Sequence, residues 1–111
     1  VFNKYSPDLL FFGHTYETRD WVPRLSARLD IPFISDSTDF NYENDELKIT
    51  RPIYQAKLIQ ELSLNSKKAI LSFQAGSFSV DNLESGNASI NSISPDLSNV
   101  NNTIQPGERF Q

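Results

Sequence analysis

The spacing of hydrophobic and polar positions changes several times in the first two thirds of the chain, and each change predicts a different element. Residues 8–13 hold the continuous apolar run Leu-Leu-Phe-Phe between a proline and a glycine, which predicts a strand buried on both faces. Residues 19–29 have apolar side chains at helical spacing, which predicts a helix capped by Thr18 with Pro23 close to its start. Residues 31–35 predict a second short buried strand. We expect this βαβ unit to have parallel strands.

From residue 40 on, apolar and polar residues alternate, which is typical of strands with one buried face. Alternation over residues 40–52, interrupted by the polar residues 43–46, predicts a β-hairpin. Residues 57–64 fit either a short helix or a strand. Residues 69–73 predict another buried strand. The elements together indicate an α/β fold with parallel strands and a hairpin.

Serine and asparagine dominate residues 77–102, with only scattered single aliphatic side chains. Such a composition predicts a linker or an extended arm and not a packed core. Residues 88–93 do alternate, so one exposed strand remains an alternative there.

Composition narrows the function classes. The 111 residues are enough for one domain, and the net charge of -4 with no basic run argues against nucleic-acid binding. We expect no membrane span, because no apolar stretch approaches about 18 residues. The absence of cysteine excludes disulfides and thiolate metal sites. Because the chain begins at Val1 just before an expected central strand, we interpret it as incomplete at that end.

The loop after the first expected strand is the natural place for a ligand, since ligands of open parallel sheets bind beyond the carboxyl ends of the strands. Gly13, Thr15 and Thr18 are weak candidates for contacts with a cofactor phosphate. The loop has one glycine instead of three and no P-loop lysine, so an ordinary capped helix turn is the favoured interpretation.

Catalytic and metal-binding residues are harder to find. His14 is the single histidine, and no nucleophile or carboxylate stands at a diagnostic spacing from it, so we interpret it as a hydrogen-bonding or surface residue. Asp36, Asp39 and Glu43 lack the arrangement of a calcium loop. We expect Asp36 to end a strand, no metal site, and no catalytic residue in this chain.

Four arginines form the remaining candidate site: Arg19, Arg24, Arg28 and Arg51. Arginine suits bidentate pairing with carboxylates, which is typical of interfaces between subunits or domains. The alternative is a set of surface salt bridges, each of which contributes little.

Four motifs in order resemble the electron transfer flavoprotein alpha subunit. Residues 13–29, GHTYETRDWVPRLSARL, resemble the family pattern G-x-T-x-x-x-R-D-x-x-P-R-x-x-A-R-L. Three shorter motifs follow at similar positions: ISD at residues 34–36, TRPIY at residues 50–54 and FQAGSF at residues 73–78, the last being similar to F-R-P-G-A-F. The resemblance covers roughly residues 7–78.

The resemblance implies a fold, a cofactor and partners. Residues 1–78 would be the second half of a Rossmann-like, three-layer N-terminal domain, and residues 57–62 would be a strand. Residues 79–111 would be a linker toward an FAD-binding domain, marked by a G-G-R-G motif that this sequence lacks, so FAD would belong to the parent protein and not to this chain. The domain would pack against the beta subunit of an electron carrier that serves dehydrogenases.

Two alternatives to this hypothesis are a free-standing nucleotide-binding or protein-interaction module of Rossmann-like fold and an enzyme in its own right, which would rest only on His14. The resemblance places the protein in the cytoplasm or the mitochondrial matrix, and we see no targeting segment. Because the resemblance implies that neighbouring strands are missing, we expect the strand at residues 8–13 to have an open apolar edge. The isolated chain should then be marginally stable, self-associate or be held by a partner.

Overall fold

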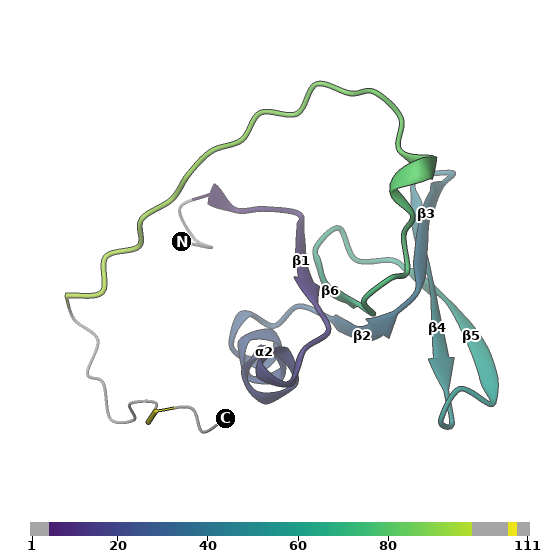
Figure 1. Cartoon of the computed structure of the whole chain (residues 1–111), viewed down its shortest axis with the longest axis horizontal. Helices are drawn as coiled ribbons and strands as arrows, with labels where there is room; N and C mark the ends of the chain where they lie inside the picture. The colour runs from purple at the N-terminus through teal and green to yellow at the C-terminus, as the bar shows by residue number, and fades with distance from the viewer. Residues whose placement is uncertain (1–4, 99–106, 109–111) are drawn as a thin grey trace.

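The computed structural model describes residues 5–98 and 107–108. The described part of the chain contains an α-helix and two three-stranded sheets. In Figure 1 they are followed by a long C-terminal arm. The elements in chain order are β1 (Leu9–Gly13), α2 (Tyr16–Leu29), β2 (Phe33–Ser37), β3 (Asp39–Glu43), β4 (Glu46–Ile53), β5 (Leu58–Leu64), β6 (Ala69–Phe73) and the short 3-10 helix η1 (Val80–Asn82). In the described part of the chain, no helix has the length and apolar character that crossing a membrane requires.

The first sheet has three parallel strands in the order β1-β6-β2. The central strand is β6, whose first four residues are buried. The prediction that residues 8–13 are buried on both faces is wrong, because β1 lies at the edge of the sheet and Phe11 is 53% exposed. β1 and β2 are parallel as expected, but β6 lies between them.

Helix α2 begins earlier than the apolar spacing indicates. Thr15, not Thr18, is the N-cap, and its side chain accepts a hydrogen bond from the backbone N–H of Thr18. Pro23 therefore lies inside the helix and not at its start. The helix packs on the parallel sheet through the fully buried Val22, and Trp21 meets Phe12 edge-on at a centroid distance of 5.4 Å.

Strand β2 begins and ends two residues later than predicted. Asp36 does not end it: this residue has a φ of 61° inside the strand, where the register with β6 shifts between Ile34 and Ser37. The left-handed bend at Asp36 acts as a bulge, which redirects the chain toward the second sheet.

The second sheet is antiparallel, in the order β3-β4-β5. The predicted hairpin is confirmed as β3 and β4, joined by Asn44 and Asp45 with φ angles of 53° and 61°. Positive φ at both central residues is the geometry of a type I′ turn, which matches the twist of the strands it joins. Of the ambiguous residues 57–64, Leu58–Leu64 form the strand β5. The family resemblance implies a strand over residues 57–62.

The core lies where the two sheets meet. Ile34 and Leu71 from the parallel sheet pack against Leu47 and Ile49 from β4. Four aromatic rings extend this core, with centroid distances between 5.4 and 6.0 Å, and they belong to Phe11, Phe40, Phe73 and Phe78. The predicted α/β class, with parallel strands and a β-hairpin, is confirmed.

After β6 the chain leaves the two sheets. Apart from η1, residues 74–98 contain no helix or strand, so the alternating residues 88–93 do not form the exposed strand that was the alternative there. Residues 85–98 are exposed throughout and arc away from the sheets in Figure 1. The last part of the predicted arm, residues 99–102, lies outside the described residues.

Candidate functional site

The carboxyl ends of the three parallel strands bring together side chains that are far apart in the sequence. His14 follows β1, Ser72 lies near the end of β6, and Asp36 lies in the bulge of β2. Arg19 reaches the same place from the first part of α2. We call these four residues the strand-end cluster.

His14 connects the members of this cluster. Its Nδ1 lies 3.0 Å from the Ser72 hydroxyl, and the Nε–H of Arg19 donates to its Nε2 at 3.0 Å. Because Nε2 accepts, the neutral ring carries its proton on Nδ1 and donates to Ser72. The Ser72 hydroxyl also accepts a hydrogen bond from the backbone N–H of Asp36 at 3.1 Å, and an Asp36 carboxylate oxygen lies 3.7 Å from His14 Nε2.

The arrangement favours a positioning role for the cluster over catalysis. Both ring nitrogens of His14 already have protein partners, and its side chain is 9% exposed. Ser72 is fully buried, so its hydroxyl is not available to a substrate as a nucleophile. Sequence reasoning missed Ser72, and the available signal was a serine inside an otherwise apolar buried strand.

The loop proposed for phosphate contacts is occupied by its own hydrogen bonds. The Thr18 hydroxyl donates to the carbonyl of Gly13 at 2.7 Å, and the Thr15 hydroxyl caps the helix. Glu17 adds a negative charge to the first turn, where it repels phosphate. The loop borders a hollow of about 330 Å³, which is also lined by His14 and Arg19.

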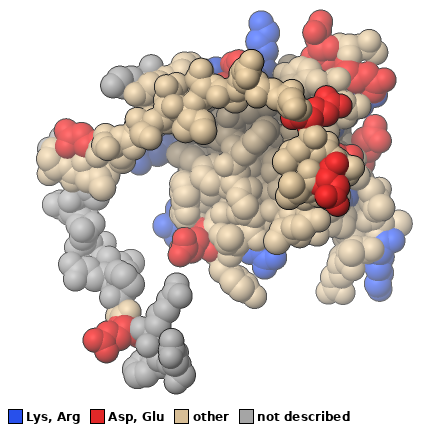
Figure 2. Space-filling view, turned by 45° about the horizontal axis from the view of Figure 1, so that its top comes forward, with Lys and Arg blue, Asp and Glu red and all other residues tan. Residues whose placement is uncertain are grey.

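The candidate arginines lie on two different elements. Arg19, Arg24 and Arg28 are exposed on α2, whereas Arg51 is half-buried on β4 in the other sheet. Among the described residues, none of the four forms an ion pair with a carboxylate. On the face in Figure 2, the basic side chains lie at separate places around the rim and do not form one patch.

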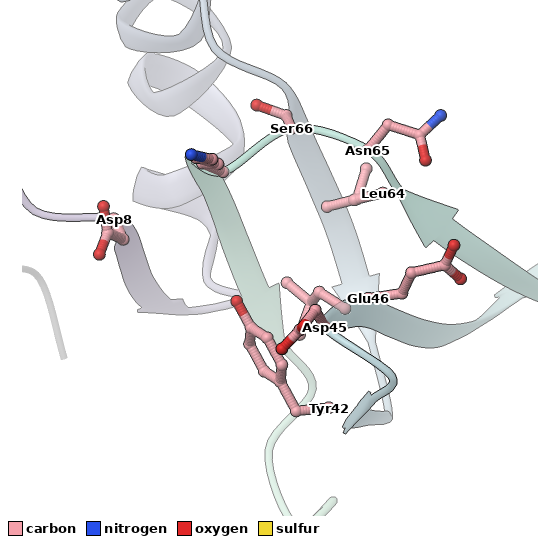
Figure 3. Close-up of a pocket in the computed structure, with 9 residues that line it drawn as sticks. Asp8, Tyr42, Asp45, Glu46, Leu64, Asn65 and Ser66 are labelled. Atoms are coloured by element: carbon pink, nitrogen blue, oxygen red, sulfur yellow. The ribbon is translucent and has the colours of Figure 1, made fainter.

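A second hollow, of about 410 Å³, lies at the opposite end of the parallel strands. It is bounded by the start of β1, the turn between β3 and β4, and the connection from β5 to β6, as Figure 3 shows. The charged residues that line this hollow are Asp8, Asp45, Glu46 and Lys67, so the acidic side chains outnumber the basic one. Within residues 5–98 and 107–108, no group of three His, Asp or Glu side chains is placed to hold a metal ion.

The outer face of the antiparallel sheet is polar. Glu43 accepts a hydrogen bond from Lys48 at 3.2 Å, and this bond together with the opposite charge raises the pKa of Lys48 above its ordinary value. Glu61 and Glu46 act in the same direction more weakly. This ion pair is exposed, so it contributes little to stability.

Comparison with known proteins decides the family. The model of the electron transfer flavoprotein domain matches residues 1–98. The chain belongs to the electron transfer flavoprotein family. It is 29% identical over 106 residues to the electron transfer flavoprotein subunit alpha of Bacillus subtilis (strain 168), a match that covers 95% of this chain and 33% of that protein.

Two further relatives support the same family. The electron transfer flavoprotein subunit alpha of Clostridium acetobutylicum is 41% identical over 59 residues, covering 51% of this chain and 18% of that protein. Protein FixB of Clostridium saccharobutylicum is 29% identical over 100 residues, covering 87% of this chain and 30% of that protein. The chain therefore spans about a third or less of the length of these relatives. The resemblance to part of the alpha subunit is confirmed.

Proposed function

We propose that this electron transfer flavoprotein chain is a scaffold and subunit-contact part of an alpha subunit. The parent protein would be a heterodimeric electron carrier that contains FAD and serves dehydrogenases. The observation that supports this role most directly is the family match across residues 1–98, in a chain whose helix N-terminus is capped by its own threonines. We propose a part of an electron carrier and not an enzyme.

In this proposal, FAD is held by a domain outside this chain. Residues 1–78 supply the packed α/β unit, and residues 79–111 form a linker toward that domain. The exposed, irregular backbone of residues 85–98 supports a linker role. Gly13, Thr15 and Thr18 serve to fix the start of α2, since their polar groups bond to one another.

The proposed partner of the scaffold is the beta subunit of the electron carrier. Arginine side chains without an acidic partner are suited to meet carboxylates across a protein interface. Arg24 and Arg28 on α2 are one candidate contact, and Arg51 on β4 is another.

Co-purification tests the proposal. The chain is expressed with an affinity tag together with an electron transfer flavoprotein beta subunit, and the complex is analysed by size-exclusion chromatography and by flavin absorbance. We expect a complex with the beta subunit, and no flavin bound by the chain alone. If the chain binds no beta subunit, the proposed subunit-contact role is wrong. Heat released on titration with AMP, ADP, ATP or FAD would instead favour the free-standing nucleotide-binding module.

A further inference from the structure

The end of the hairpin between β4 and β5 extends beyond the parallel sheet and carries large apolar side chains in solvent. Tyr54 is 72% exposed, Leu58 55% and Ile59 77%. In Figure 1 this end points away from the helix and from the other sheet. Tyr54 and Leu58 also border a hollow of about 610 Å³ with Gln55 and Lys57.

Strand register shows that one face of this hairpin continues the core face. Leu47 and Ile49 point into the core, and alternation along β4 places Arg51 and Ile53 on the same face. Leu58 pairs directly with Ile53 and therefore shares this face. The core face of the antiparallel sheet thus continues past the parallel sheet that covers its first part.

Arg51 lies where the covered part of this face ends. Its Nη2 donates to the Ser35 hydroxyl at a long 3.4 Å, and its Nε is enclosed without any acceptor. Within the described residues it forms no ion pair. A guanidinium that is partly removed from water without full pairing is unfavourable, and an anionic group brought from outside offsets that cost.

The turn at the hairpin end holds these side chains in an unusual backbone conformation. Tyr54, Gln55 and Ala56 have φ angles of 50°, 55° and 64°, so three consecutive residues other than glycine are left-handed. Such a conformation is unfavourable for residues with a Cβ. Strained segments of this kind concentrate at functional surfaces.

We propose that Arg51, Ile53, Tyr54 and Leu58 form a docking surface for a partner polypeptide, which presents a carboxylate to Arg51 and apolar side chains to Tyr54 and Leu58. We call it the hairpin surface. The proposal rests on the proposed function, with the beta subunit as the partner, and it assigns the contact to the hairpin and not to the arginines of α2. A protein fits better than a nucleic acid, because the exposed side chains of Tyr54 and Leu58 are apolar and the chain has a net charge of -4.

Affinity for the beta subunit tests the hairpin surface. We compare the chain with the variants Arg51→Ala, Leu58→Ser, Arg28→Ala and Lys67→Ala by isothermal titration calorimetry against purified beta subunit. Arg28→Ala tests the competing contact on α2. Lys67→Ala is the matched control, since Lys67 is an exposed cation between β5 and β6 and belongs to neither candidate contact. We expect Arg51→Ala to weaken binding at least about 30-fold and Leu58→Ser about tenfold, with Arg28→Ala and Lys67→Ala within about twofold.

Photo-crosslinking provides a second, direct measurement. In chain co-expressed with the beta subunit, p-benzoylphenylalanine in place of Tyr54 should crosslink to that subunit, and the same residue in place of the exposed Tyr16 should not. Leu58 is exposed, so Leu58→Ser keeps the fold even if circular dichroism finds Arg51→Ala unfolded.

These measurements distinguish a failure of the proposed subunit-contact role from a failure of the hairpin surface alone. No binding by the unmodified chain overturns both the subunit-contact role and the hairpin surface. Normal affinity of Leu58→Ser together with no crosslink from position 54 overturns the hairpin surface alone. If Arg28→Ala loses as much affinity for the beta subunit as Arg51→Ala does, the contact lies on α2. That result also overturns the hairpin surface.

Discussion

Replacing Ser72 with alanine removes one oxygen that serves two donors inside the strand-end cluster. Its hydroxyl accepts from the ring of His14 at 3.0 Å and from the backbone N–H of Asp36 at 3.1 Å. Ser72 is fully buried, so water cannot take its place without a rearrangement. The alanine methyl group fills most of the space, and the two donors lose their acceptor.

The magnitude follows from the number of donors left without a partner. A buried donor that loses its acceptor costs about 1–3 kcal/mol, so two of them predict a loss of about 2–6 kcal/mol in the free energy of unfolding. With a urea slope of about 2 kcal/mol per molar, this loss lowers the denaturation midpoint by about 1–3 M. This is a large part of the total stability of a small domain, which is about 5–15 kcal/mol.

Urea denaturation followed by circular dichroism measures this loss. Ser63→Ala is the matched control, because the Ser63 hydroxyl is exposed and donates to Glu46 at 2.9 Å, and we expect it to change stability by less than about 0.5 kcal/mol. A Ser72→Ala loss no larger than that of Ser63→Ala would refute the role of Ser72 as a shared acceptor.

The histidine ring provides an independent readout. His14 is the single histidine, so nitrogen NMR of the labelled protein reports one ring. We expect the neutral ring to carry its proton on Nδ1 in the unmodified chain, and this preference to weaken in Ser72→Ala. A neutral ring protonated on Nε2 in the unmodified chain would contradict the hydrogen bond from Arg19.

Three further predictions follow from local geometry. Thr15→Ala should lower stability by about 1 kcal/mol through loss of the N-cap, measured by thermal melting; an unchanged melting temperature would contradict the cap. Ala56→Gly should raise stability by up to about 1 kcal/mol, because glycine accepts the φ of 64° without strain; a destabilised variant would argue against that conformation. The open edge of β1 should make the isolated chain self-associate in sedimentation experiments, and Phe11→Lys should reduce association; a cooperative melt of a dilute monomer would refute this expectation.

Local patterns in the sequence were sufficient for most individual elements. The run at residues 69–73 predicted β6 with its correct bounds, and the alternation around residues 43–46 predicted the hairpin of β3 and β4. These succeed because side-chain periodicity and turn chemistry act between near neighbours. The start of α2 was missed because Thr15 and Thr18 are both acceptable caps by residue type, and only the folded loop selects Thr15.

The strand-end cluster could not be predicted from patterns of neighbouring residues in the sequence. His14 and Ser72 are 58 positions apart, and they meet only because β6 inserts between β1 and β2. The same insertion leaves β1 at an edge and buries β6 on both faces. Arg51 was found by residue type, but its half-buried position depends on how far β4 extends past the parallel sheet.

By itself the sequence determined most element types, the family resemblance and the serine- and asparagine-rich composition of the arm. Each depends on residue order within short windows, where spacing controls which side chains share a face. The tertiary structure alone decided the strand order, the shared hydroxyl of Ser72 and the uncovered end of the hairpin. These arise from contacts between distant segments, whose geometry is set by packing of the whole fold and not by any one segment.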